Sequence, residues 1–257
     1  MSSAEVPELL HFEFSHFNEK VRWALDLKGT PHRRTPLLPG PHERTIKKLT
    51  GQSGTPVLRI PGGCLHGSAE IIDWLEHNGG GAPLYPKDPE ERRRALEIQT
   101  WFDERIGAQG RLALFFELLP SSRYAARVFS VGHSGFGAAC YRAIFPLLVP
   151  VMNRKMQIDA PRAEEGRARV LEGLDFVAKQ GGDGFLVGNA FSIADLTAAS
   201  LLYPAVMPEG LHYDIPMPLA PVMERWLERW RDHPGGAWVR RIFRDHRAAR
   251  VRVRVKS

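Results

Sequence analysis

The chain has 257 residues, and at about 150 residues per domain this length predicts two folded units. Its composition, with 43% hydrophobic and 25% charged residues, is typical of a globular protein and excludes a disordered chain. Because the sequence shows no run of about 18 apolar residues and no signal sequence, we expect a cytoplasmic protein without a membrane partner.

The net charge of +6 is concentrated at one end of the chain, where residues 224–257 carry eleven Arg and Lys against four acidic residues. No nucleic-acid recognition motif accompanies these charges. The pattern therefore favours a solvated helix face with a frayed tail, and docking of this segment on an anionic partner is the alternative. The two cysteines, Cys64 and Cys140, form neither a CxxC pair nor a zinc-ligand spacing, so we expect no disulfide and no metal.

The first eighty residues alternate between strand and helix patterns. In chain order they predict a strand over 8–14, a helix from Asn18 to before Gly29, a strand over 32–38, a helix over 42–49, a hairpin of 55–60 with 64–66, and a helix over 69–77. Ser68 is the expected N-cap of the last helix. In the first helix the charged residues are expected on faces away from the core: Glu19, Lys20, Arg22 and Lys28. The order βαβαββα predicts an α/β domain.

Glycine and proline then interrupt the periodicity between about residues 78 and 89. We therefore predict an N-terminal domain of residues 1–80, a linker of residues 81–89 and a C-terminal domain of residues 90–257. Beyond the linker the patterns are helical over about 89–119, 121–158, 161–180, 192–207 and 218–231, which predicts an all-α unit. Ser192 and Asp195 fit the S-x-x-D capping box at the start of the fourth of these helices.

Four segments carry a resemblance to a known family. They are Ser15–Arg22 (SHFNEKVR), Gly54–Leu58 (GTPVL), Gly67–Leu75 (GSAEIIDWL) and Gly188–Asp195 (GNAFSIAD). With these segments in this order, the chain resembles the serine-type glutathione S-transferases. The resemblance implies a thioredoxin-like N-terminal domain that binds glutathione as co-substrate, an all-helical C-terminal domain and a homodimer.

Ser15 is the predicted catalytic residue. A thiol with a pKa near 8.5 is only a few per cent thiolate at pH 7, and the thiolate is the nucleophile. Between a strand and a helix start, a hydroxyl hydrogen bond and the helix dipole can both stabilise an anion. The resemblance implies that the Ser15 hydroxyl donates to the glutathione sulfur, and because serine cannot form a mixed disulfide, conjugation is favoured over thiol exchange. From the residues alone, Ser15 equally suits a simple helix cap.

The resemblance also implies how the rest of glutathione is held. Thr55, before a cis-proline at Pro56, would pair its backbone with the cysteinyl part, although an ordinary trans-proline is also compatible with the residues. Gly67 and Ser68 would hold the γ-glutamyl end at a helix N-terminus. Asn18 either caps the first helix or reaches the ligand.

Two departures from the family concern charge. Gly67 stands where members usually carry an acid, and Gly54 stands where many carry Lys or Arg; each missing contact would weaken binding by about one to two powers of ten. Glu70, Gln52 and Ser53, or a neighbouring subunit, are candidates to compensate, and a different thiol is the other explanation.

The start of the helical domain supplies apolar and aromatic residues that match the family's electrophile pocket, although such residues at helical spacing more often form a core: Trp101, Phe102, Phe115, Phe116, Tyr124 and Phe129. We therefore predict a detoxification-type transferase that adds the Ser15-activated thiolate to an electrophilic, apolar small molecule. The alternative is a non-catalytic member of the same fold that serves as a binding or scaffold protein.

Overall fold

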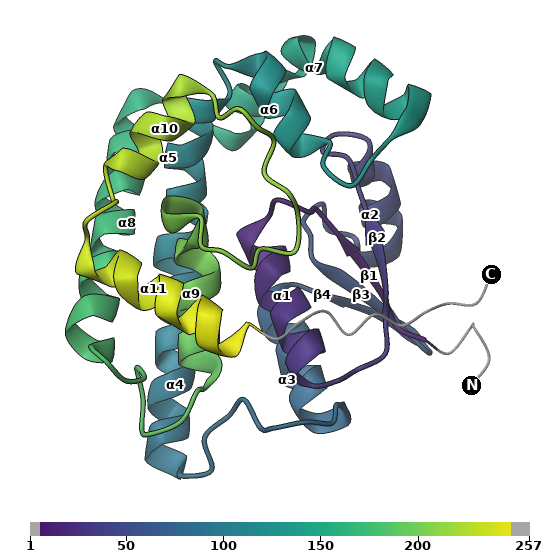
Figure 1. Ribbon diagram of the computed structural model, residues 1–257. Coiled ribbons are helices and arrows are strands. Elements are labelled where there is room, and N and C mark those ends of the chain that lie inside the picture. The colour runs from purple at the N-terminus through teal and green to yellow at the C-terminus, as the bar shows by residue number, and fades with distance from the viewer. Residues whose placement is uncertain (1–5, 248–257) are drawn as a thin grey trace. The chain divides into compact units, whose positions relative to one another are not determined.

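The structure, a computed structural model, describes residues 6–247 and divides into two compact units (Figure 1). The first unit extends to Leu84, and the second comprises Tyr85–Arg247. The division falls within the predicted linker of residues 81–89.

The first unit has the predicted thioredoxin-like order βαβαββα. Its strands form one mixed sheet in the order β2-β1-β3-β4, with β1 parallel to β2 and antiparallel to β3. The elements are β1 (Glu8–His11), α1 (His16–Leu27), β2 (Arg33–Pro36), α2 (His42–Thr50), β3 (Val57–Ile60), β4 (Gly63–His66) and α3 (Ser68–Asn78). The predicted hairpin is present, since β3 and β4 pair antiparallel across Pro61 and Gly62.

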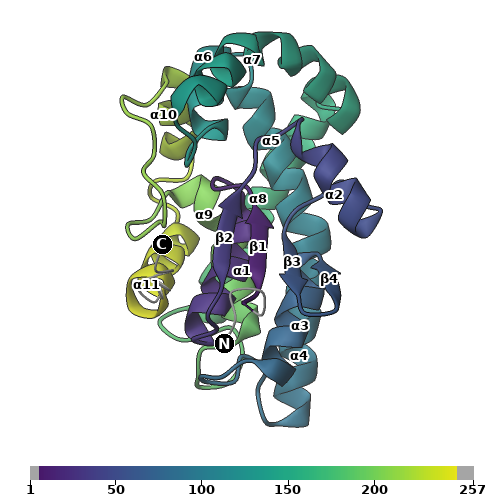
Figure 2. The same cartoon turned by 90° about the vertical axis from the view of Figure 1, so that its right-hand side faces the viewer.

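The register of β1 and β3 places a core on each face of this sheet. Leu10 lies opposite Val57, and both pack with Ile46 of α2. Successive strand residues point to opposite faces, so the fully buried pair Leu9 and Leu58 faces the other way. Helices α1 and α3 lie side by side on that face, and α2 lies on the opposite one (Figure 2).

Helix α1 buries charged residues that we predicted on faces away from the core. Glu19, Lys20 and Arg22 are fully buried, and Lys28 just after the helix is only 4% exposed. Buried charge is tolerated when it is paired: Arg22 Nε lies 2.9 Å from Glu19 Oε2, and Lys28 Nζ lies 2.6 Å from Glu76 Oε2. Hydrophobic spacing misses this arrangement because it treats every charged side chain as solvent-facing.

In its described residues the second unit contains helices and no strands, as predicted. A π-helical segment, Phe102–Gly107, joins the first two helices. The helices are α4 (Pro89–Trp101), α5 (Ala108–Leu118), α6 (Ser122–Phe129), α7 (Gly135–Met156), α8 (Ala160–Gly181), α9 (Ile193–Val206), α10 (Pro221–Glu228) and α11 (Pro234–His246). The pattern over 121–158 is thus two helices rather than one, separated by a turn in which Gly132 has a φ of 81°.

Helix α11 lies beyond the last predicted helix, within the basic segment for which we expected a solvated helix face. One face of α11 is buried through Trp238, Val239, Ile242 and Phe243, while Arg240 and Arg244 are exposed. A basic amphipathic helix therefore completes the unit. The last basic residues, 248–257, lie outside the described residues.

The predicted capping box at α9 is present. Ser192 Oγ accepts a hydrogen bond from the N–H of Ala194 over 3.3 Å, and the Asp195 carboxylate accepts one from the N–H of Ser192 over 2.9 Å. Asp195 also accepts from the N–H of Leu186 over 2.8 Å. The box therefore starts α9 and ties the preceding loop to it.

Candidate active site

The segment between β1 and α1 is held by the buried guanidinium of Arg22. This group donates hydrogen bonds to the carbonyl oxygens of Phe12 and Glu13, each over 3.0 Å, and to that of Ser15 over 3.4 Å. Its Nη1 lies 2.8 Å from Nδ1 of His11, which must accept because arginine only donates. Since these carbonyls bond to Arg22, β1 ends at His11 and not at the predicted residue 14.

Ser15 is the N-cap residue of α1 by its backbone but not by its side chain. Its carbonyl oxygen accepts the hydrogen bond from the N–H of Glu19 over 2.8 Å, whereas its hydroxyl makes no capping hydrogen bond. The alternative that the Ser15 hydroxyl caps the helix is therefore wrong. The partly exposed hydroxyl stands at the N-terminus of α1, where the helix dipole favours negative charge.

Asn18 links α1 to the segment before β3. Its side-chain amide is fully buried and donates a hydrogen bond to Oγ1 of Thr55 over 3.1 Å. The Asn18 Oδ1 atom is buried and has no hydrogen-bond partner in the part of the chain that the structure describes. Asn18 is thus not a helix cap; it brings the first turn of α1 to Thr55.

A second link joins Thr55–Pro56 to the start of α3. The peptide bond between Thr55 and Pro56 is cis, and the carbonyl oxygen of Pro56 accepts a hydrogen bond from the N–H of Gly67 over 3.0 Å. Through these two links the fold brings together most of the predicted glutathione-binding residues: Asn18, Thr55, Pro56, Gly67 and Ser68.

The start of α3 differs from the prediction by one residue. Gly67, not Ser68, is the N-cap, and Ser68 is the first helical residue. Gly67 has a φ of 91° and a ψ of 151°, a conformation that is open almost only to glycine. The carboxylate of Glu70 reaches back to accept a hydrogen bond from the N–H of His66 over 3.0 Å, so it serves the helix start.

Gln52 is not joined to this group of residues. Its side chain is exposed, and its N–H donates to Oγ1 of Thr50 over 3.1 Å. The neighbouring Ser53 is anchored instead, because its carbonyl oxygen accepts from Nε2 of His42 over 3.0 Å. Nδ1 of His42 accepts from the N–H of Gly40, which places the proton of the neutral imidazole on Nε2.

Four of the six aromatic residues predicted for an electrophile pocket form ring contacts within the second unit. Phe115 and Phe129 lie 5.2 Å apart between ring centroids, and Trp101 and Phe102 lie 4.9 Å apart. Trp101 and Phe116 are partly exposed, whereas the others are buried: Phe102, Phe115, Tyr124 and Phe129. Most of this set is therefore core.

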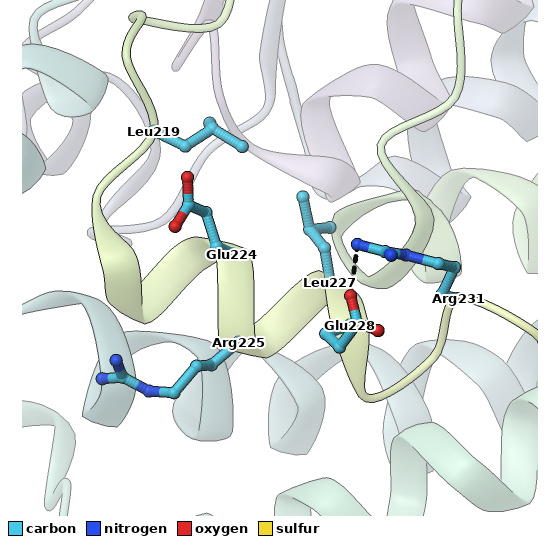
Figure 3. Close-up of a pocket in the computed structure, with 6 residues that line it drawn as sticks. All are labelled: Leu219, Glu224, Arg225, Leu227, Glu228 and Arg231. Carbon is cyan, nitrogen blue, oxygen red and sulfur yellow. Dashed lines mark ion pairs between the residues drawn. The ribbon is translucent and has the colours of Figure 1, made fainter.

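A surface pocket of about 530 Å³ lies on α10 (Figure 3). Its lining includes the ion pair of Glu228 with Arg231 and two apolar side chains, Leu219 and Leu227. None of the residues that we predicted for glutathione lines it. This pocket therefore does not identify the glutathione site, whereas the network around Asn18 and Thr55 joins the predicted residues.

Arg22 has a structural role that its sequence pattern does not predict. It positions the backbone of the segment that ends in Ser15, yet it was assigned only to a helix face away from the core. The spacing of Glu19 and Arg22, three residues apart in a helix, was a signal for a pair. The spacing does not show that the pair of Glu19 and Arg22 is buried, and this burial is what gives the pair its structural role.

Comparison with known proteins agrees with this architecture. The family model described as glutathione S-transferase, N-terminal domain, matches residues 9–83, and the one described as glutathione S-transferase, C-terminal domain, matches residues 160–229. The chain belongs to the glutathione S-transferase family. All four segments that carried the resemblance lie inside these ranges, whereas α4 to α7 lie outside them.

One curated relative and two solved structures of the family share 17–24% identity with this chain. A probable maleylacetoacetate isomerase of Caenorhabditis elegans is 24% identical over 205 residues, 79% of this chain and 80% of the relative. The crystal structure of a glutathione S-transferase from Rhodospirillum rubrum F11 has a TM-score of 0.62 and 19% identity over 93% of this chain and 88% of that one. One from Methylobacillus flagellatus, with glutathione bound, has a TM-score of 0.61 and 17% identity over 93% and 95%. These structures share the fold.

Proposed function

We propose that this glutathione S-transferase binds glutathione at the N-terminus of α1, at Thr55–Pro56 and at Gly67–Ser68, and that Ser15 activates the thiol. The observation that carries the proposal is the Ser15 hydroxyl, which stands at the start of α1 without making a capping hydrogen bond. A hydroxyl in that position can donate to an anion next to the N–H groups of the first helical turn.

The free energy needed to ionise the glutathione thiol lies within the range that the Ser15 hydroxyl and the helix N-terminus can supply. Lowering the pKa of a thiol by about two units requires roughly 2.7 kcal/mol of preferential stabilisation of the thiolate. A hydrogen bond to a charged group contributes about 1.5–3 kcal/mol, and a helix N-terminus contributes about 0.3–1 kcal/mol. Together they suffice without a metal or a second acid–base residue.

The binding contacts follow from the two links already described. The backbone of Thr55 would pair with the cysteinyl part of glutathione as an added strand. The buried Oδ1 of Asn18, which lacks a partner in residues 6–247, supplies an acceptor beside Thr55. Gly67 and Ser68 would present the N-terminus of α3 to the γ-glutamyl carboxylate.

The proposed second substrate is an electrophilic, largely apolar small molecule. The maleylacetoacetate isomerase relative suggests one form of this chemistry. A thiolate that adds to an activated cis double bond forms a C–S bond and leaves a single C–C bond that can rotate; elimination then breaks the C–S bond and returns the thiolate. If the adduct is released before elimination, the reaction is a conjugation. Conjugation and isomerisation both use the same activated sulfur, so we propose that this site carries out both reactions.

The decisive experiment compares Ser15→Ala with Ser121→Ala, because Ser121 is the N-cap of α6 and its side chain also makes no capping hydrogen bond. We expect Ser15→Ala to raise the pKa of bound glutathione and to lower kcat/KM with a model aryl halide by about 10- to 100-fold. Ser121→Ala should leave both unchanged. Wild-type activity in Ser15→Ala would contradict the role of the hydroxyl.

The scaffold alternative is favoured by one observation, the missing charges at Gly54 and Gly67. Calorimetric titration of the wild-type protein with glutathione tests it directly. Binding at or below millimolar concentration supports the transferase, whereas no binding at millimolar glutathione supports the scaffold. Homodimerisation is part of the proposed function, and light scattering measures it in the same samples.

A further inference from the structure

Helix α7 exposes an apolar stripe. Four large hydrophobic side chains on it are solvent-exposed: Phe136 by 86%, Leu147 by 76%, Val151 by 62% and Ile144 by 49%. They are four of the six large hydrophobic residues that are exposed in residues 6–247. With Cys140, which is also exposed, they recur every three or four residues and so share one side of the helix.

The other side of α7 is anchored in its own unit. Ala138, Tyr141 and Phe145 are buried, and the Phe145 ring lies 5.3 Å from that of Phe129. Residues Gly135–Met156 are long and apolar enough to cross a bilayer by length and composition alone, and this is the one such helix in the described chain. Because one face is packed against protein, the exposed face can contact lipid only if the helix lies in the plane of the membrane surface.

The sequence segment that carries the stripe has charges of one sign only. Residues 118–158 contain no Asp or Glu, but they contain five Arg or Lys. Arg154 and Lys155 are exposed at the end of α7, and Arg154 follows Val151 by three residues, so it continues the stripe. Two copies meeting through this face would bring basic groups together with no acidic partner from the same segment. An anionic surface is the complementary partner.

We propose that α7 docks flat on anionic phospholipid bilayers, with Phe136, Ile144, Leu147 and Val151 at the boundary of the acyl chains and with Arg154 and Lys155 at the phosphates. The segment lies outside both family-model matches, and the proposal does not rest on the transferase activity. It replaces the expectation that the chain has no membrane partner.

The test is flotation of the full chain with vesicles of phosphatidylcholine alone or mixed with phosphatidylglycerol. We expect binding only to the phosphatidylglycerol vesicles, and weaker binding as salt is raised. Leu147→Ser should weaken binding by about tenfold, whereas Leu171→Ser, at the exposed Leu171 of α8, should not. The double variant with Arg154→Gln and Lys155→Gln should also weaken vesicle binding by about tenfold. Its control is the double variant with Lys179→Gln and Arg225→Gln, which removes the same charge from exposed residues of α8 and α10 and should bind as the wild type does.

A direct probe of contact uses Cys140 on the stripe. In Cys64→Ser protein, a polarity-sensitive fluorophore on Cys140 should shift to the blue when phosphatidylglycerol vesicles are added. Circular dichroism checks that each variant is folded. Failure to bind these vesicles, or equal losses in Leu147→Ser and Leu171→Ser, would overturn the proposal. So would a Leu147→Ser protein that changes oligomeric state and keeps its vesicle binding, because a second copy would then cover the stripe.

Discussion

The side-chain amide of Asn18 donates a hydrogen bond to Oγ1 of Thr55 over 3.1 Å, across 37 residues of sequence. It connects the first turn of α1, which begins after Ser15, with the residue that precedes the cis peptide bond to Pro56. This one bond therefore holds together the proposed thiol-activating group and the proposed backbone contact for glutathione.

The first prediction concerns that bond. Asn18→Ala and Thr55→Val each remove one partner, and Thr55→Val does so with little change in shape. In a double-mutant cycle followed by chemical denaturation, we expect a coupling of about 1 kcal/mol in the free energy of unfolding. The affinity for glutathione should fall in both single variants. Additive effects on unfolding would mean that the bond does not couple the two segments.

The second prediction concerns Arg22. Arg22→Lys keeps the charge but loses the planar donor group that serves the carbonyl oxygens of Phe12 and Glu13. We expect it to lower the free energy of unfolding by about 3 kcal/mol and to raise KM for glutathione. The matched control is Arg33→Lys at an exposed position in β2, which should be near wild type. Equal behaviour of the two variants would remove Arg22 from the positioning of Ser15.

The third prediction concerns the two glycines that replace charged residues of the family. A Cβ atom at Gly54 would lie 3.4 Å from Nε2 of His66 and is sterically acceptable. We expect Gly54→Arg to tighten glutathione binding by about one to two powers of ten in calorimetric titration. The control Gly63→Arg, an open position in β4, should leave affinity unchanged.

Gly67→Glu should behave differently. The position is open, but its φ of 91° strains any side chain. We therefore expect Gly67→Glu to lower the free energy of unfolding by about 1–3 kcal/mol without improving affinity. A stable variant with tighter binding would show that the backbone does not dictate glycine here.

The fourth prediction concerns pH. Burial raises the pKa of Asp195 to about 6, even though the carboxylate accepts hydrogen bonds from Leu186 and Ser192. The folded state therefore binds the proton more tightly than the unfolded state, whose Asp pKa is about 3.9. The contribution of Asp195 to stability is present below about pH 4 and is lost as the pH rises to about 6, by up to about 3 kcal/mol.

Asp195→Asn removes this titration. The wild-type free energy of unfolding minus that of the variant should therefore fall between pH 4 and pH 7, as measured by urea denaturation at each pH. The same difference for Asn189→Ser, at an exposed residue without a titratable group, should stay flat over this range. A difference that is constant or rises with pH for Asp195→Asn would contradict the raised pKa.

The local features of this protein can be predicted from its sequence. The order βαβαββα followed by helices, the hairpin around Pro61 and Gly62, and the capping box of Ser192 and Asp195 all follow from patterns within a few residues. Such patterns report which residues share a face and which groups satisfy a helix end, because these interactions are made between near neighbours.

Features that depend on distant parts of the chain could not be predicted in this way. The bond from Asn18 to Thr55, the burial of Arg22 and the left-handed backbone of Gly67 arise because packing brings separate segments together and must then satisfy their polar groups. The exposed stripe of α7 is of the same kind. Its residues are apolar on nearly every side, and only packing against Phe129 settles which side remains for a partner.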